Sequence, residues 1–230
     1  MLIVGCGDVG RKLASGAMAH TEPVYCLVGS PASAADLQGQ GLTTRAVDLD
    51  RGAPVLDHDW DQREIFYLAP PPPAGETDPR MQRFLQSLPR DRRHRIVYIS
   101  TSGVYGNCAG AWVDETRPVD PQVDRARRRL SAERQLLAWR SDGGGEVVIL
   151  RVAGIYGRGK LPLERLRQGL PMIGADEAPW TNRIHIDDLV EGVFRLAISR
   201  HSGPMNLGNP AELSLLEMAS TIIKLTRSKS

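Results

Sequence analysis

The sequence predicts an α/β fold: a doubly wound parallel sheet covered by helices on both faces, with a small C-terminal substrate lobe. The first observation is that short segments rich in Val and Ile alternate with helical patterns along the chain. The second is a glycine-rich loop that directly follows the first apolar segment and opens the first helix. Such alternation is typical of a parallel sheet that is buried on both faces.

The expected elements follow one another in a regular order. Six strands are predicted, at residues 2–5, 23–28, 43–49, 64–69, 95–100 and 146–152. Helices fit between most of them, notably at residues 11–19, 79–88 and 125–140. Two more helical patterns occupy residues 187–199 and 214–225, the second opening with Ser214 and Glu217 at the spacing of a capping box.

Length and composition are those of an ordinary globular chain, with 230 residues of which 41% are hydrophobic and 24% charged. We expect one domain over residues 1–230, with substrate-lobe elements at about 155–183 and 203–230. The net charge of +2 indicates neither a nucleic-acid nor a membrane partner, and no apolar stretch is long enough to span a bilayer. The first residues, MLIVGCGDVG, do not form a signal-peptide pattern, so we expect a cytoplasmic location.

Three cysteines, Cys6, Cys26 and Cys108, are scattered along the chain without CxxC spacing. A sparse, odd set of this kind is typical of a reducing cytoplasm and gives no indication of a zinc site. We therefore expect no metal.

The glycine-rich loop reads GCGDVG and has the GxGxxG pattern of a Rossmann-type dinucleotide fingerprint. In that fingerprint the first glycine makes the tight turn, the second lets the backbone approach a pyrophosphate, and the third lets helix and strand pack closely. The helix N-terminus adds N–H groups and a partial positive charge. The loop therefore predicts a site for NAD or NADP formed by Gly5, Cys6, Gly7, Asp8, Val9 and Gly10. The alternative is a glycine turn that binds nothing.

The acidic residue that an NAD site carries after its second strand is missing here. Gly29 and Ser30 stand in its place, and Ser30 is the expected ribose contact. No carboxylate is present there to repel a 2′-phosphate, and no neighbouring arginine is evident in the sequence to attract one. This favours NADP slightly over NAD; alternatively, Gly29 and Ser30 form only a turn and the ribose is bound weakly.

Six segments, in order, resemble the extended short-chain dehydrogenase/reductase family, including its atypical YeeZ-like epimerase/dehydratase members. They are VDLD at 47–50, FYLAP at 66–70, YISTSGVYG at 98–106, ILRVAGIYGRG at 149–159, RIHIDDLVEG at 183–192 and MNLGNPAELSLLEMA at 205–219. The resemblance implies that Asp48 reaches the adenine and that Leu49 and Ala69 lie beside the cofactor. It also implies a homodimer.

The same resemblance indicates the catalytic residues. A Ser or Thr five residues before the glycine of VYG contacts the reacting oxygen in this family, and counting back from Gly106 gives Thr101. The next helix of the family carries Tyr-x-x-x-Lys, the acid/base pair, with a Glu four residues after the lysine. Here that Glu is Glu133, which places Arg125 and Arg129 where the Tyr and Lys would stand.

Arginine stays protonated at physiological pH, so neither Arg125 nor Arg129 can act as a general acid/base. Because residues four apart share a helix face, both are expected to point towards the sheet with Ala132 and Leu136. Two inward guanidinium groups could bind phosphate or carboxylate, or pair with a buried acid. The remaining arginines of this helix are expected on its solvated face, and they are Arg127, Arg128 and Arg134.

Other polar residues are expected to be structural. Tyr105 and Tyr156 favour packing roles, and His185 should lie at a strand end near the cleft, with Asp187 capping the next helix. Two functional hypotheses remain. The first is an NAD(P)-binding oxidoreductase or epimerase/dehydratase-like enzyme with altered catalytic groups and an unknown small-molecule substrate, for which an anion is one candidate. The alternative is a non-catalytic dinucleotide sensor or regulatory protein.

Overall fold

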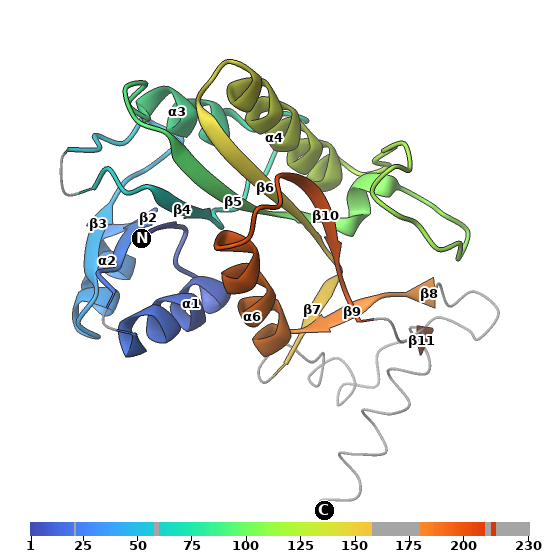
Figure 1. The fold of residues 1–230 in the computed structure, drawn as a ribbon, viewed down its shortest axis with the longest axis horizontal. Coiled ribbons are helices and arrows are strands. Elements are labelled where there is room, and N and C mark those ends of the chain that lie inside the picture. The colour runs from blue at the N-terminus through green and yellow to red at the C-terminus, as the bar shows by residue number, and fades with distance from the viewer. Residues whose placement is uncertain (21, 58–59, 158–179, 210–212, 215–230) are drawn as a thin grey trace, which may run out of the picture.

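The computed structural model describes residues 1–230 except residues 21, 58–59, 158–179, 210–212 and 215–230 (Figure 1). Its centre is a seven-stranded sheet in the order β10-β6-β5-β4-β1-β2-β3, and every pairing in it is parallel. The strands are β1 (Leu2–Val4), β2 (Tyr25–Val28), β3 (Thr43–Ala46), β4 (Glu64–Tyr67), β5 (His94–Thr101), β6 (Gly145–Val152) and β10 (Gly203–Leu207). The predicted fold class and all six predicted strands are confirmed.

Helices cover both faces of this sheet (Figure 1). One face is covered by α1 (Asp8–Ala19), α2 (Pro31–Gln38) and α6 (Ile186–Ala197), and the other by α3 (Pro79–Ser87) and α4 (Asp124–Ser141). Helix α1 begins earlier than predicted, because the last residues of the glycine loop are already helical. Helix α2 was not predicted, although Ser30 caps it and Pro31 occupies its first position, both common at helix starts.

Each face has its own apolar core. On one side Leu13 of α1, Leu37 of α2 and Val193 of α6 pack on the sheet, and on the other Phe84 of α3 and Leu136 of α4 do so. All five are fully buried, and each contributes roughly 1.5–3 kcal/mol to folding. An ion pair of 2.7 Å between Lys12 Nζ and Asp187 Oδ1 joins α1 to α6. The two cores hold the strand ends, and therefore the loops, in fixed positions.

The strand order reverses between β1 and β4. From β1 the chain runs outwards through β2 and β3, then returns to the other side of β1 as β4. In open parallel sheets such a reversal leaves a crevice at the carboxyl ends of the two strands, where ligands bind. The glycine loop follows β1 directly and so lies at this crevice.

The C-terminal part contains short strand pairs outside the main sheet. Strand β7 (Gly154–Tyr156) runs parallel to β9 (Arg183–His185), and β8 (Trp180–Thr181) runs antiparallel to β11 (Leu213–Ser214). Much of the expected substrate lobe and nearly all of the helix expected at 214–225 lie outside the described residues. Ser214 itself belongs to β11. Among the residues described, no helix is long and apolar enough to cross a membrane.

Candidate functional site

Gly5 makes the turn that leads from β1 into the glycine loop. Its φ of +90° belongs to the left-handed region that favours glycine. A Cβ on Gly5 would lie 2.5 Å from the backbone nitrogen of Ala69, just beyond β4. Any other residue would therefore push the ends of β1 and β4 apart.

Gly7 borders open space, whereas Gly10 is closely packed against its neighbours. Gly7 is the residue before the first turn of α1, and a Cβ placed on it would meet no heavy atom within 4 Å. On Gly10 a Cβ would lie 3.1 Å from the Gly5 carbonyl oxygen and 3.3 Å from the side chains of Ile3 and Leu68. Gly10 thus allows helix and strand to pack closely, while Gly7 leaves open space in front of the helix N-terminus. This is the geometry that a pyrophosphate needs.

The loop borders a cleft of about 500 Å³, within the size range of small-molecule sites. All six loop residues predicted from the fingerprint line it. The other lining residues come from α1, the end of β2, α2 and the segment after β4: Arg11, Val28, Gly29, Ser33, Leu68 and Pro70. The sequence had indicated Gly29 and the segment 66–70, but it had not indicated Arg11, Val28 or Ser33. No group of three His, Cys, Asp or Glu side chains suited to a metal occurs in the described part of the chain.

Arg11 corrects one expectation, because an arginine does stand near Gly29. The first turn of α1 aims it at the end of β2, where it lines the cleft together with Gly29 and Ser33. Its Nη2 lies 2.6 Å from Oδ2 of Asp36 on α2, in an ion pair that is partly exposed. The signal was available in the sequence, since Arg11 directly follows the last glycine of the fingerprint.

The other predicted cofactor residues have structural partners in this protein. Ser30 caps α2 by accepting a hydrogen bond of 3.2 Å from Ser33 N–H. Asp48 accepts one of 2.9 Å from Asp50 N–H, and the carbonyl of Leu49 accepts one of 2.7 Å from Arg83. Ala69 packs against Gly5. Their contacts with a cofactor stay predictions.

Thr101 is the last residue of β5 and is half-buried. Its Oγ1 accepts a hydrogen bond of 3.2 Å from Gly103 N–H in the short 3₁₀ turn η1 (Ser102–Tyr105). A Cβ on Gly103 would lie 3.4 Å from Thr101 Oγ1 and 3.8 Å from Ala126 Cβ. Thr101 therefore lies beside the first turn of α4, at the carboxyl edge of the sheet.

The arginine run on α4 divides differently from the prediction. Arg125 is exposed, so its expected inward position is wrong. Arg128 is only 7% exposed, although it was expected in solvent, and its Nη1 donates to the carbonyl of Gly75 at 2.6 Å. The reason is tertiary: the segment before α3 folds over this turn of α4 and supplies a carbonyl to Arg128. Only Arg129 takes the inward position assigned to it.

Arg129 binds the strand beneath it. Its Nη1 donates to the Ile99 carbonyl at 2.8 Å and to Tyr98 Oη at 3.3 Å, and its guanidinium lies 5.6 Å from the Tyr98 ring centroid. Burial raises the pKa of Tyr98 to about 12 against the opposite effect of Arg129, so this phenol stays protonated. Within the described residues Arg129 forms no ion pair with a buried acid. Arg129 and Tyr98 together therefore do not reproduce a Tyr–Lys acid/base system.

The buried acidic residue of α4, Glu133, pairs with an arginine of β6 and not with the arginines of its own helix. Glu133 is 1% exposed and pairs with Arg151 of β6 at 2.9 Å, while Ser100 Oγ also donates to it. Arg151 Nη1 donates to Tyr105 Oη at 2.9 Å, and Tyr105 donates to Asn206 at 2.7 Å. This buried network holds β5, β6, β10 and η1 against α4. It gives Tyr105 the packing role that was expected.

Two polar groups near α3 are buried with an oxygen that has no hydrogen-bond partner. They are Tyr67 Oη and Asp78 Oδ2. Burial raises the pKa of both groups. The other oxygen of Asp78 caps α3 by accepting from Arg80 and Met81 N–H groups at 3.1 Å. Both side chains lie on the α3 face of the sheet and do not line the cleft.

At the start of α6 the capping residue differs from the expected one. His185 precedes the helix, and its Nδ1 accepts from Asp187 N–H at 3.3 Å. Asp187 instead pairs with Lys12, and this hydrogen-bonded pair lowers the pKa of the Asp187 carboxyl. The Tyr156 ring packs edge-on against His185, with centroids 5.2 Å apart. His185 therefore has a structural role at this helix start.

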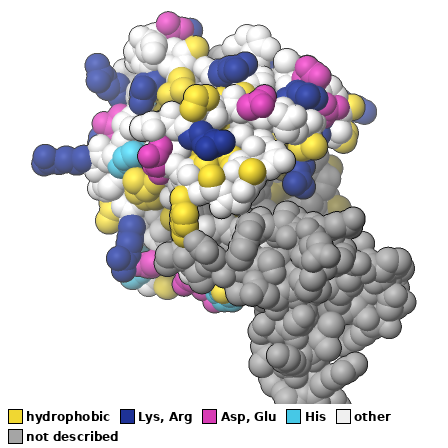
Figure 2. Space-filling model, turned by 90° about the vertical axis from the view of Figure 1, so that its right-hand side faces the viewer, with side chains coloured by type: hydrophobic (Ala, Val, Ile, Leu, Met, Phe, Trp, Pro, Cys, Tyr) yellow, Lys and Arg dark blue, Asp and Glu magenta, His cyan; other side chains and the backbone are white. Residues whose placement is uncertain are grey.

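Side chains of both signs are interspersed on the face of the molecule seen in Figure 2. On the surface of α4, Arg127 pairs with Asp124 at 2.7 Å. A solvated role for this arginine agrees with the sequence interpretation.

Comparison with known proteins places these features in context. A family model described as "NAD dependent epimerase/dehydratase family" matches residues 80–208, more than half of the chain. The dTDP-glucose 4,6-dehydratase of Streptomyces niveus is 30% identical over 156 residues, which are 62% of this chain and 45% of that protein. UDP-glucuronic acid decarboxylase 1 of Arabidopsis thaliana is 29% identical over 143 residues, 56% of this chain and 33% of that protein. The chain thus spans less than half the length of these two relatives.

Solved structures share the fold. MoeE5 in complex with UDP-glucose and NAD superposes with a TM-score of 0.81 at 24% identity, covering 98% of this chain and 81% of that one. UDP-glucuronic acid 4-epimerase from Bacillus cereus in complex with NAD gives 0.79 at 21% identity, covering 98% and 83%. At these identities the similarity describes architecture alone.

Proposed function

The chain belongs to the NAD dependent epimerase/dehydratase family, and from this premise we propose that it binds NAD or NADP at the cleft beside Gly5–Gly10. The observation that carries the proposal is the open space in front of Gly7 at the N-terminus of α1. In this assignment the first N–H groups of α1 bind the pyrophosphate, and Gly5 and Gly10 hold the loop close to the sheet. The two neighbouring structures named above contain NAD, in agreement with this assignment.

We further propose that the protein is an oxidoreductase or an epimerase/dehydratase-like enzyme whose substrate contacts Thr101. A bound nicotinamide supplies or accepts a hydride. Thr101, at the carboxyl end of β5, donates a hydrogen bond to the reacting oxygen and orients it. Arg129 fixes the end of β5 by holding the Ile99 carbonyl, and the exposed Arg125 is available to a substrate anion. The proton must then come from a group other than a Tyr on α4.

The second candidate is a non-catalytic dinucleotide sensor or regulatory protein. One observation favours it: the α4 positions of the family's Tyr and Lys hold an exposed Arg125 and an Arg129 that is already bound to β5. Neither side chain can exchange a proton near neutral pH. In this case the dinucleotide is a regulatory ligand, and a partner protein distinguishes the bound from the unbound form of the chain.

For the choice of dinucleotide, Arg11 and Ser33 favour NADP, because they lie where a ribose 2′-phosphate would reach the end of β2. Asp36 competes for Arg11, so NADP binding requires Arg11 to exchange this partner for the phosphate. We propose that both dinucleotides bind and that NADP is preferred.

A titration of the purified protein with NADH and NADPH tests these proposals. Nicotinamide fluorescence and thermal stability should both change on binding, since a ligand that binds only the folded state stabilises it. Absence of binding at millimolar concentrations would contradict the dinucleotide site. Oxidation of the bound NAD(P)H on addition of carbonyl compounds, including nucleotide-linked keto-sugars, would support the enzyme. Binding without turnover over a broad substrate panel would favour the sensor.

A further inference from the structure

Two cysteines that are distant in sequence meet behind the glycine loop. Cys26 lies opposite Ile3 in the β1–β2 pairing, and Cys6 follows β1 in the loop that turns into α1. Both side chains belong to the core on the α1 face of the sheet. The two thiols lie close enough for each to shift the pKa of the other. The spacing of the cysteines gave no sign of this contact, which arises from the pairing of neighbouring strands.

The two thiols differ in their access to the cleft. Cys6 lines the cleft and is 5% exposed, whereas Cys26 is fully buried. A small molecule that enters the cleft therefore reaches Cys6 first. A ligand bound along the glycine loop would cover the same thiol.

The surroundings of Cys6 favour its thiolate. It stands immediately before the N-terminal end of α1, where the helix dipole lowers thiol pKa values. The neighbouring Cys26 thiol lowers the pKa of Cys6 against the effect of burial, and the Arg11 guanidinium lowers it further. The neighbouring Cys6 thiol, with burial, raises the pKa of Cys26. A nucleophilic thiol next to a protonated one is the arrangement of a redox-sensing cysteine and its resolving partner.

We propose that Cys6 and Cys26 form a peroxide-sensitive thiol pair whose oxidation to a disulfide disables the dinucleotide cleft. The Cys6 thiolate attacks one oxygen of hydrogen peroxide, the O–O bond breaks, and the departing hydroxide takes up a proton to leave as water. Cys6 is then a sulfenic acid. The Cys26 sulfur attacks the Cys6 sulfur, the S–O bond breaks, and the second hydroxide leaves as water with the Cys26 proton. Overall, two thiols are oxidised and one peroxide is reduced to two waters.

The effect on binding follows from the position of Cys6. A disulfide replaces the contact between the two thiols by a bond of about 2.05 Å, with Cβ atoms about 3.8 Å apart. Cys6 directly precedes Gly7, so drawing it towards β2 moves the N-terminus of α1 away from a bound pyrophosphate. This consequence rests on the proposed dinucleotide function, whereas the thiol chemistry does not.

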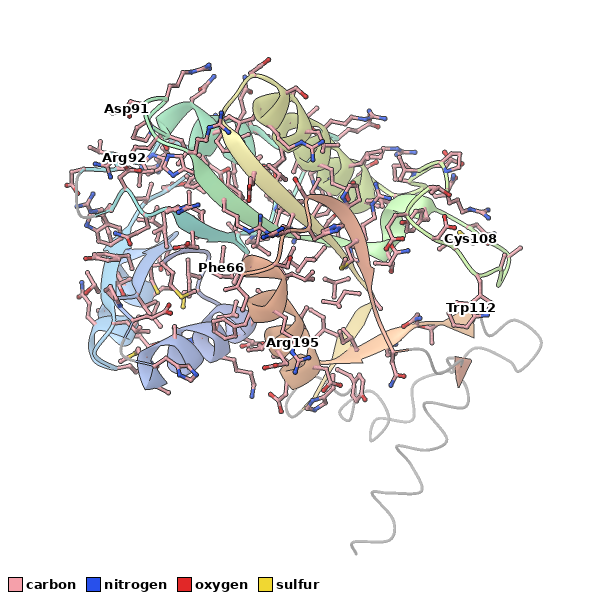
Figure 3. All side chains as sticks on the ribbon, in the orientation of Figure 1. Phe66, Asp91, Arg92, Cys108, Trp112 and Arg195 are labelled. Atoms are coloured by element: carbon pink, nitrogen blue, oxygen red, sulfur yellow. The ribbon has the colours of Figure 1, made fainter. Side chains whose placement is uncertain are left out.

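Tryptic peptide mapping tests the pair in the full-length protein. Cleavage after Arg11, Lys12, Arg45 and Arg95 places the three cysteines on separate peptides. The reduced protein is treated with one equivalent of hydrogen peroxide, with and without NADPH, and the remaining thiols are alkylated. Cys108 is the internal control, because it lies on the loop after η1, at the other side of the molecule from α1 (Figure 3).

The expected product links residues 1–11 to residues 13–45 through a disulfide, while Cys108 is alkylated to the same extent in all samples. The oxidised protein should bind dinucleotide at least tenfold more weakly, and a thiol reductant should restore binding. In Cys26→Ala, Cys6 should stop at the sulfenic acid and be trapped by dimedone. If that variant does not fold, the peptide map of the unmodified chain decides alone. Unreacted Cys6, or its oxidation without linkage to Cys26, would overturn the proposal.

Failure of this proposal and failure of the dinucleotide site remain distinguishable. Reduced protein that binds NADPH but forms no disulfide retains the proposed function and refutes the thiol pair. A disulfide in a protein that binds neither dinucleotide when reduced keeps the thiol pair, but overturns its effect on the cleft.

Discussion

The glycine loop and helix α4 meet the same edge of the sheet, yet only the loop has the geometry that the sequence predicts for it. In the loop, Gly5 turns the chain, Gly7 leaves space and Gly10 permits close packing. On α4, the residues that the family resemblance assigns to the acid/base positions are Arg125 and Arg129, one exposed and one bound to β5. The proposed binding and catalytic roles therefore fall on different elements and can be tested separately. Four predictions test this comparison.

The largest effect is expected at Glu133, which tests the structural role of α4. Glu133→Ala leaves Arg151 buried and uncompensated, a change that costs about 3–5 kcal/mol of unfolding free energy. Chemical denaturation measures this loss. Arg134→Ala is the matched control, because Arg134 is exposed on the same helix and should change stability by less than about 0.5 kcal/mol. Equal effects of the two variants would contradict the buried network.

Gly7→Val should separate binding from folding in the loop. The new side chain enters open space at a φ of −81°, which ordinary residues adopt, so the melting temperature should stay near that of the original chain. Affinity for NADPH should fall at least tenfold, since the side chain fills the proposed pyrophosphate position. Gly52→Val, also in open space but in a loop away from the cleft, is the control. Unchanged affinity in Gly7→Val would refute the site.

Arg129→Ala tests whether this arginine supports the sheet or holds a ligand. Loss of the hydrogen bond to the buried Ile99 carbonyl should lower the unfolding free energy by about 1–3 kcal/mol, and dinucleotide affinity should change little. Arg125→Ala should leave stability within about 0.5 kcal/mol. A large loss of affinity in Arg129→Ala at unchanged stability would restore the ligand role.

The most selective effect is expected at Arg11, where only the choice of dinucleotide is affected. Arg11→Ala removes a charged hydrogen bond to the proposed 2′-phosphate, which is worth about 1.5–3 kcal/mol, or roughly ten- to hundredfold in NADPH affinity. NADH affinity should stay within a factor of about three, well below the tenfold that 1.4 kcal/mol represents. Lys12→Ala, on the opposite side of α1 against α6, is the control. Parallel losses for both dinucleotides would mean that Arg11 binds the shared pyrophosphate.

The sequence was sufficient for six of the seven strands of the sheet and for the location of the cleft, but it did not predict β10, whose residues were expected in the substrate lobe. Strand composition identified the six strands. The GxGxxG spacing identified the loop, because Gly5 and Gly10 are required by close packing and Gly7 leaves open space. The burial of Arg128 could not be predicted in the same way. Helical periodicity describes one helix only, whereas the Gly75 carbonyl that binds Arg128 comes from the segment before α3. The proximity of Cys26 to Cys6 was missed for a similar reason. The neighbours of Arg128 and of Cys26 come from other elements, so their surroundings follow only from the assembled sheet.

The ion pair between Lys12 and Asp187 has a consequence for the order in which the protein is completed during synthesis. Helix α1, which borders the cleft, leaves the ribosome long before α6, because Lys12 and Asp187 are 175 residues apart in the chain. Contacts between such distant segments form late, because a long chain must close before they contribute. The α3–α4 face, whose residues are all made earlier, can assemble first. The nascent chain can therefore present a nearly finished sheet, with α1 packed on it, before α6 covers the remaining side of α1.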